Sequence, residues 1–315
     1  MRFLVLEHPV VELLTEVSME LKVNDVEGCD YPRCKSQRRY YVALSIAGSD
    51  SSGGAGEQAD LKTFSALGVY GATAITAITA QNTEGVYSQM ALPAEMVQSQ
   101  IIAVMEDIAP RVVKIGMLAN VEVATAVADT LARYSIPIVL DPVMVSSSGH
   151  RLLSVEAQEV LKRRLLPMAC LVTPNIPEME ALTSMSLSTA EQKRAAAHYL
   201  IDLGARAVLL KGGHEQGDAK TDILYRSTAE GVSESYFSHR TISTRNIHGT
   251  GCTLSSAIAA YVARGLSLEE AVGAAKEYIG AAIAAGADVA IGRGFGPVNH
   301  LFSPLTMQTY EEPKL

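Results

Sequence analysis

The chain has no tryptophan and only 5 phenylalanines, and its 4 cysteines are too few and too scattered for a disulfide framework. No apolar run reaches the roughly 18 residues of a membrane-spanning helix, so we expect neither a disulfide-rich secreted fold nor a membrane protein. Positive charge is also scarce, because 26 Lys and Arg stand against 34 Asp and Glu, a net charge of −8. Nucleic-acid binding needs clustered Lys and Arg. The composition therefore favours a small-molecule partner over nucleic acid.

The cysteines and the first residues indicate a reducing compartment. Cys29 and Cys34 form a C-x4-C pair without a second ligand pair nearby, which fits two unpaired thiols better than a zinc site. Cys170 lies inside an apolar run. Glu7 and Glu12 interrupt any signal-peptide core and disfavour a mitochondrial presequence. We therefore expect a cytoplasmic protein.

The chain divides into one large domain with an extension at each end. Residues 1–40 carry scattered charges and predict a short helix near 10–21, whereas 41–302 show continuous periodic patterns and 303–315 form a tail. Single α/β domains reach this size. We therefore expect one domain at 41–302 and no second core.

Short β-branched runs alternate with amphipathic helical patterns from residue 41 onward, which predicts βα units on a largely parallel sheet. The strands we expect are 42–47, 72–80, 112–115, 136–140, 171–173 and 207–211. A polar alternating pair, 221–225 and 233–237, predicts an antiparallel edge hairpin, and 253–263 and 268–287 predict the last two helices. Ligands bind beyond the carboxyl ends of parallel strands, so the residues that follow these strands should line one cleft.

The run from His248 to Thr253 reads His-Gly-Thr-Gly-Cys-Thr and leads into a helix of small residues. Such a turn directs backbone N–H groups and the positive end of a helix dipole at one place, which suits an anion. Cys252 lies at the mouth of that helix, where its thiolate form should be favoured. It is then a nucleophile, a proton acceptor or a hydrogen-bond partner, unless it is only a small buried residue. His248 is expected to shape the turn.

A second turn rich in Gly and Ser, residues 48–56, also enters a helix. Alone it is explained equally well by a tight strand-to-helix connection. Asp60 lies about one turn inside this helix, where its carboxylate either interacts with the helix dipole or reaches into the cleft to hold a substrate hydroxyl or amine.

Together these segments resemble the hydroxymethylpyrimidine and phosphomethylpyrimidine kinases of thiamine biosynthesis, which belong to the ribokinase-like superfamily. The matching motifs follow the family's order and are 47–64, 80–86, 114–119, 141–145, 173–178, 210–214 and 248–260. The resemblance covers about 41–302 and implies a three-layer α/β/α fold with a mostly parallel central sheet and an antiparallel edge hairpin. It also implies phosphoryl transfer from ATP, with Mg²⁺, to 4-amino-5-hydroxymethyl-2-methylpyrimidine and then to its monophosphate, by a homodimer.

By this resemblance, the backbone amides of Gly249, Thr250, Gly251 and Cys252 form an anion hole for the transferred phosphoryl group. Cys252 stands where sugar kinases of the superfamily carry an aspartate base, so the resemblance makes it the proton acceptor. An ordinary thiol has a pKa of roughly 8.5, and we expect the helix N-terminus to lower it.

The resemblance also assigns the nucleotide and metal ligands. Asp141 ends a buried strand and is expected beside the phosphates and Mg²⁺. Asn175 and Glu178 match the family's Asn-x-x-Glu motif for Mg²⁺, with Glu178 acting partly through water, although a helix capping box explains the same spacing. Lys211 resembles the lysine that meets the nucleotide phosphates, the alternative being a strand-end lysine in solvent.

The family pattern places the pyrimidine among Gly48, Asp60, Gln81, Met117 and Val143 or Met144. Asp60 and Gln81 offer a carboxylate and an amide to the ring nitrogens and the exocyclic amine. Met117 and Val143 supply apolar faces, as small-ligand pockets require, although Met117 alone would be ordinary core.

The chain departs from the family at Glu57, where an apolar residue is usual, and at 146–150, where many relatives have Lys-Ser-Gly or Thr-Ser-Gly. We expect Glu57 to face solvent or a partner subunit. Two rival functions stay open, a pyridoxal or pyridoxine kinase of the same superfamily and a non-catalytic relative that binds a thiamine precursor. Gln81 and Met117 favour the pyrimidine, and Cys252 favours an enzyme.

Overall fold

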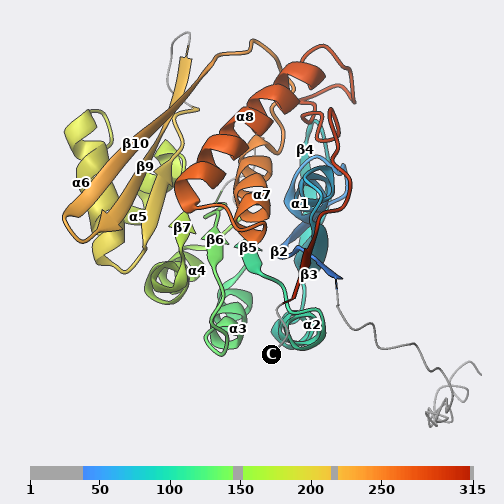
Figure 1. The fold of residues 1–315 in the computed structure, drawn as a ribbon, viewed down its shortest axis with the longest axis horizontal. Helices are drawn as coiled ribbons and strands as arrows, with labels where there is room; N and C mark the ends of the chain where they lie inside the picture. Colours follow the sequence, from blue (N-terminus) through green and yellow to red (C-terminus); the bar gives the residue numbers. More distant parts are fainter. Residues whose placement is uncertain (1–37, 145–151, 214–218, 313–315) are drawn as a thin grey trace, which may run out of the picture.

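The computed structural model describes residues 38–144, 152–213 and 219–312. Their central element is a nine-stranded sheet of order β10-β9-β8-β7-β6-β5-β2-β3-β4 (Figure 1). The strands are β2 (Val42–Asp50), β3 (Tyr70–Asn82), β4 (Gly85–Ala91), β5 (Val112–Ile115), β6 (Ile138–Leu140), β7 (Leu171–Val172), β8 (Ala207–Leu210), β9 (Ala219–Thr228) and β10 (Gly231–Arg240). The six central strands, β8, β7, β6, β5, β2 and β3, are parallel to one another. At the edges, β4 is antiparallel to β3, β9 is antiparallel to β8, and β10 is antiparallel to β9.

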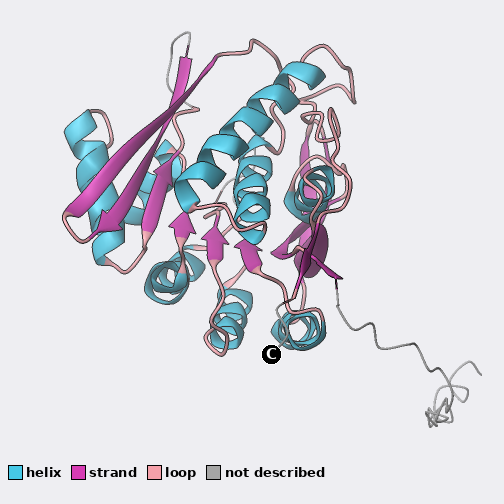
Figure 2. Cartoon of the chain, in the orientation of Figure 1, coloured by secondary structure: helices cyan, strands magenta, loops and turns pink. Residues whose placement is uncertain are grey.

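Helices cover both faces of the sheet (Figure 2). They are α1 (Gly56–Ala66), α2 (Ala94–Asp107), α3 (Val121–Leu131), α4 (Val155–Val160), α5 (Ile176–Thr183), α6 (Ala190–Asp202), α7 (Thr250–Ala263) and α8 (Leu268–Gly286). Successive strand residues face opposite layers, since Ala43 packs in the apolar cluster with α1, α7 and α8, whereas Leu44 packs with α2 to α6. The predicted α/β/α class is therefore confirmed. Among the described helices, none has the length and apolarity of a membrane span.

The sequence did not predict β4, and it placed the start of α7 three residues late. Side chains along β4 are mostly exposed, including Tyr87 and Met90, so the strand lacks the buried alternation that marks strands. Helix α7 starts at Thr250, directly after Gly249. The residues of the Gly-Thr-Gly-Cys motif are thus mostly the first turn of the helix itself.

The segments on either side of the predicted domain pair with each other. Strand β1 (Arg38–Tyr40) runs antiparallel to β11 (Thr309–Glu311). Tyr310 packs on Tyr41 with ring centroids 5.0 Å apart, and the Arg111 guanidinium lies 4.7 Å from the Tyr310 ring centroid. Part of the predicted tail therefore packs on the domain. The helix expected at 10–21 and the loop 146–150 lie outside the described residues.

Candidate active site

A cavity of ≈ 720 Å³ opens at the carboxyl ends of the parallel strands. Each strand end contributes polar residues to its wall, as the parallel pattern predicts. The lining includes every predicted site residue except Asp60, namely Gly48, Gln81, Met117, Val143, Asp141, Asn175, Glu178, Lys211, Gly249, Thr250, Gly251 and Cys252.

The turn before α7 is built from glycine for a steric reason. Gly249 has φ 78, and a Cβ there would lie 1.9 Å from the Gly54 carbonyl oxygen. No side chain caps α7, so its first-turn amides face the cavity without a side-chain acceptor. The Thr250 amide donates to the Ile247 carbonyl at 3.3 Å. The turn itself thus uses one of the four amides predicted to form the anion hole.

Lys211 connects the two carboxylates predicted to serve the nucleotide and metal. Its Nζ lies 2.8 Å from Asp141 Oδ1 and 3.7 Å from Glu178 Oε2. Burial would raise the pKa of Asp141, but the charges of Lys211 and Lys114 and the hydrogen bonds from Lys211 and Thr173 together hold that pKa below its usual range. A Cβ on Gly251 would lie 3.4 Å from Lys211 Nζ and 3.9 Å from Asp141 Oδ2. The cluster therefore lies against the first turn of α7.

Asn175 and Glu178 form the capping box that was the alternative to a metal motif. The Asn175 amide donates to Glu178 Oε2 and the Glu178 amide donates to Asn175 Oδ1, both at 2.8 Å. Glu178 also lines the cavity, so the cap and a ligand role coexist. Burial raises the pKa of Glu178 to about 7, with Lys211 opposing this and Asp141 adding to it.

The carboxylates of Asp141 and Glu178 fit a hard cation that takes few of its ligands from protein. The described residues contain no group of three or more His, Cys, Asp and Glu side chains placed to hold a metal ion. Asp141 and Glu178 nevertheless share one cation, Lys211. The pKa of Glu178 is raised by burial and by the charge of Asp141 despite that lysine. Mg²⁺ binds through one or two carboxylates, phosphates and waters, so these two carboxylates suit it.

The Cys252 thiol does not have the lowered pKa that the sequence predicts. Burial raises its pKa to about 11, although Lys114 and a backbone hydrogen bond with Gly56 oppose the shift. Asp60 and Asp141 add to it, because their negative charges disfavour a thiolate. At neutral pH the unliganded thiol is therefore protonated, which argues against a standing thiolate nucleophile.

Asp60 does not face the cavity, which corrects its prediction as a ring ligand. Its two carboxylate oxygens each lie 2.9 Å from Lys114 Nζ, and both side chains are fully buried. The hydroxyls of Ser45 and Ser256 also donate to this carboxylate. Asp60 thus neutralises Lys114, and it is Lys114 that lines the cavity. A lysine within the fully buried strand β5 requires such a partner, and this signal was available in the sequence.

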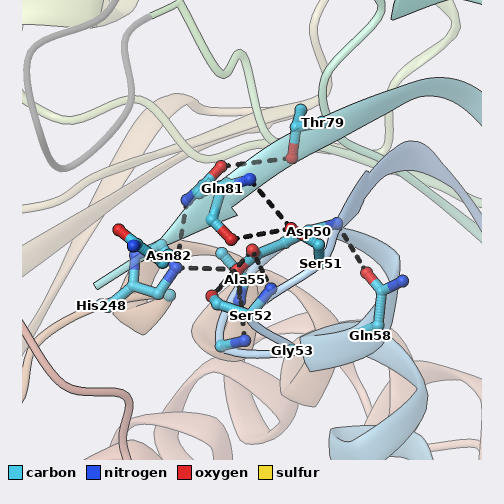
Figure 3. Close-up of polar contacts among 12 residues, drawn as sticks. Asp50, Ser51, Ser52, Gly53, Ala55, Gln58, Thr79, Gln81, Asn82 and His248 are labelled. Atoms are coloured by element: carbon cyan, nitrogen blue, oxygen red, sulfur yellow. Dashed lines mark hydrogen bonds and ion pairs between the residues drawn. The ribbon is translucent and has the colours of Figure 1, made fainter. Parts of the chain in front are cut away.

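Gln81 lies at the centre of a polar network (Figure 3). Its Nε2 is 3.3 Å from His248 Nε2, which in turn lies 2.8 Å from Asp50 Oδ2. Burial would raise the pKa of Asp50, but hydrogen bonds from His248 and Ser52 lower it to about 2. His248 thus joins the turn before α7 to the loop after β2, a role beyond shaping its own turn.

Glu57 is buried, with 6% of its surface exposed, whereas the sequence predicted contact with solvent or a partner subunit. Burial raises its pKa, and the nearby charge of Asp60 adds to the shift. The helix α1 turns this position toward the interior, as the family's usual apolar residue would require.

The far end of the cavity contains charged residues that the sequence did not single out. Lys276 of α8 forms a buried ion pair with Asp222 of β9, and both line the cavity. The other carboxylate oxygen of Asp222 accepts a hydrogen bond from the Gly212 amide at 2.9 Å. The pair thereby holds the turn that follows Lys211. In an Ala-rich helix Lys276 has the pattern of a surface lysine, so no sequence signal marks it.

Comparisons with known proteins agree with this architecture. A sequence model of the family described as phosphomethylpyrimidine kinase matches residues 50–299. The hydroxymethylpyrimidine/phosphomethylpyrimidine kinase of Rhizobium meliloti (strain 1021) is 51% identical over 260 residues, 82% of this chain and 96% of the relative. The solved phosphomethylpyrimidine kinase of Clostridium difficile 630 has a TM-score of 0.68 at 45% identity, covering 77% of this chain and 99% of that chain. A Bacillus subtilis pyridoxal kinase in an ADP complex has a TM-score of 0.75 at 35% identity, covering 83% of this chain and 97% of that chain.

Proposed function

Because the chain belongs to the phosphomethylpyrimidine kinase family, we propose that it transfers the terminal phosphoryl group of ATP to 4-amino-5-hydroxymethyl-2-methylpyrimidine and then to the monophosphate, in thiamine biosynthesis. One observation carries the proposal. Lys211 lies against the first turn of α7 in the same cavity as Cys252 and Gln81, so a phosphate site and a polar ring site share one space.

The phosphate end works by placing positive charge where negative charge develops. The amides of Gly251 and Cys252 at the start of α7, together with Lys211, face the transferred phosphoryl group. Asp141 and Glu178 would hold Mg²⁺, directly or through water. The ion, when bound, would neutralise part of the negative charge on the nucleotide phosphates. Lys211, beside both carboxylates, would supply a second positive charge to a phosphate oxygen.

The acceptor end needs a group that takes the hydroxyl proton. Cys252, as thiolate, removes the proton of the hydroxymethyl group while the new O–P bond forms and the bond to the departing diphosphate breaks. Because the resting thiol has a pKa of about 11, only its deprotonated fraction serves as base. Lys114 increases that fraction, since its charge lowers the pKa of Cys252.

The ring site is formed by Gly48, Gln81, Met117 and Val143. A Cβ at position 48 would lie 2.9 Å from Met117 Sδ, so a larger residue there would displace the Met117 side chain. Met117 and Val143 pack together in a small apolar cluster at the cavity wall. Apolar side chains and the Gln81 amide thus line the same cavity, which suits a small heteroaromatic ring.

Product analysis tests this function directly. The protein is incubated with ATP, Mg²⁺ and the pyrimidine alcohol, and mass spectrometry separates monophosphate from diphosphate. Both products are expected in sequence. Binding of the alcohol without consumption of ATP would instead support a precursor-binding relative.

Pyridoxal is the rival acceptor, because the fold is also similar to a pyridoxal kinase with a TM-score of 0.75. Steady-state kinetics with both alcohols under the same conditions distinguish the two. We expect the larger kcat/KM for the pyrimidine, and a larger value for pyridoxal would overturn the assignment.

The homodimer and the cytoplasmic location belong to the same proposal. Edge strand β4 exposes Tyr87 and Met90, and its neighbour β3 exposes Ile78, which supports a protein–protein contact at this edge. Light scattering after size-exclusion chromatography measures the oligomeric state, and a mass equal to one chain would refute the dimer.

A further inference from the structure

His248 contacts two side chains whose hydrogen-bonding requirements conflict. Its Nε2 lies 2.8 Å from Asp50 Oδ2 and 3.3 Å from Gln81 Nε2 (Figure 3). The imidazole is 5% exposed, and a Cβ on Gly54 would lie 2.5 Å from its Cδ2. The ring therefore has little room to turn away from either neighbour.

Asp50 decides where the His248 proton lies. Its pKa of about 2 keeps it ionised, and an ionised carboxylate only accepts hydrogen bonds. His248 Nε2 must then carry a hydrogen and donate it to Asp50 Oδ2. Asp50 is itself held by the amides of Ser52 and Ala55, each donating at 2.8 Å, so the donor–acceptor direction is imposed by the loop.

This direction has a consequence for Gln81. With Nε2 next to His248, the amide places a donor against a donor. At its other end, Oε1 lies 3.4 Å from Thr79 Oγ1, whose hydrogen is donated to the Ser49 carbonyl at 2.9 Å. That end therefore places an acceptor against an acceptor. A half-turn of the amide about its last side-chain torsion gives Thr79 Oγ1 an N–H to accept. It also replaces the donor beside His248 with the amide oxygen, which can share the single Nε2 hydrogen with Asp50 in a three-centre hydrogen bond.

We propose that His248, held by Asp50, is a positioning residue that orients the Gln81 amide with its oxygen toward His248 and its NH₂ group toward Thr79. The inference rests on the proposed function of the site. In this orientation the amide keeps one N–H and one oxygen lone pair for a ligand. Such an amide pairs in two hydrogen bonds with a ring edge that has an acceptor nitrogen beside an amino group, as amides do with adenine.

The orientation therefore determines specificity between the two acceptor alcohols. An aminopyrimidine has this edge, with a ring nitrogen beside the 4-amino group. Pyridoxal lacks it, because its ring nitrogen lies between a carbon that bears a methyl group and a carbon that bears hydrogen, with no amino group beside it. Because His248 directly precedes Gly249, replacing it could also disrupt the turn before α7. A disrupted turn would affect both alcohols, whereas a loss of Gln81 positioning would affect only recognition of the pyrimidine ring.

The test compares His248→Phe with His248→Gln, which can restore an N–H donor near the Nε2 position. We expect His248→Phe to lower the kcat/KM preference for the pyrimidine over pyridoxal by ~10–100-fold. The same variant should keep the KM for ATP within about threefold of the wild-type value. His248→Gln should recover part of the preference. Adding His248→Phe to Gln81→Ala should change the preference by less than about twofold, because the amide on which it acts is gone. Equal loss for both alcohols, or multiplying effects, would overturn the proposal.

His300→Phe is the matched control. His300 is also buried near the start of α7, at 4% exposed, and contacts Thr253 Oγ1 at 3.0 Å rather than the cavity. It should leave the ring preference unchanged. If it shifts the preference as much as His248→Phe does, the effect is structural and the proposal fails.

A readout independent of turnover separates this inference from the function on which it rests. In ¹⁵N-histidine-labelled wild-type protein, the His248 Nε2 resonance should be that of a protonated nitrogen near neutral pH. An unprotonated Nε2 would overturn the inference whatever the protein phosphorylates. Absence of pyrimidine phosphorylation with a protonated Nε2 would refute the function and leave the donor direction standing.

Discussion

Replacement of Cys252 gives the most direct test of the catalytic arrangement, because the structure predicts a pH profile as well as a loss. The thiol has a pKa of about 11, so its thiolate fraction is about 10⁻⁴ near pH 7 and about 10⁻² near pH 9. If that thiolate accepts the hydroxyl proton, the rate must rise with pH, since the deprotonated form is the active one.

The measurable quantity is the ratio of kcat/KM for wild type to that for Cys252→Ala, from about pH 7 to about pH 9. Both proteins share every other ionisation, so the ratio isolates the thiol. We expect it to increase about tenfold per pH unit. At its upper end the loss in Cys252→Ala should reach roughly 10²–10⁴-fold, the usual size of a general-base contribution.

Cys252→Asp separates proton acceptance from a thiol-specific role. A carboxylate is already ionised over this range, so this variant should retain activity above Cys252→Ala, and its profile should be flat. The rates are followed through ADP release at saturating nucleotide. A ratio that does not change with pH, or near-wild-type turnover in Cys252→Ala near pH 9, would refute Cys252 as the base.

Three further predictions concern charge within the domain. Glu57→Ile should stabilise the fold. The buried carboxyl has a raised pKa, so the wild type loses stability as the pH rises above the carboxyl's ordinary pKa of 4.5. The melting temperature of the variant should therefore exceed that of the wild type by more near pH 8 than near pH 4. Lys114→Met should lower the free energy of unfolding by about 3–5 kcal/mol in denaturant titrations, because it leaves Asp60 buried and unpaired. Adding Asp60→Asn should recover most of that loss, and equal stability of the single and double variants would contradict the pairing. Lys211→Met should lower kcat by ~10²-fold or more and raise the KM for ATP, with the KM for the alcohol nearly constant, and a loss confined to the alcohol would remove Lys211 from the phosphate site.

The parallel part of the fold was predictable because each central strand is apolar on both faces. The run 112–115 is predicted and observed with the same bounds, since both helical layers cover it. Strand β4 has one exposed face and the polar residues of an edge, so periodicity did not reveal it. The pairing of β1 with β11 joins residues near opposite ends of the sequence, and no local pattern encodes such a contact.

The site was predictable where a residue's role depends on the strand end that carries it. Lys211, Asp141 and Glu178 follow strands and reach the same cluster. Asp60 was predicted to face the cavity but lies in the interior, because its position in a helix does not reveal which way its side chain points. Its partner Lys114, alone among apolar residues in β5, held the missing information, since a buried lysine needs a carboxylate and Asp60 is the one beside it.

The same charges explain why a thiol suits position 252. Asp60 and Asp141 both act on Cys252 and raise its pKa, and each of them already has a lysine partner. An aspartate at 252 would add a third carboxylate to this buried group and bring a permanent negative charge against an incoming phosphate. A thiol is neutral at rest and becomes negative only when it has lost its proton. If Cys252 is the base that we propose, the cysteine would allow anionic substrate to enter before the base is charged. The low thiolate fraction near pH 7 would be the consequence of that order.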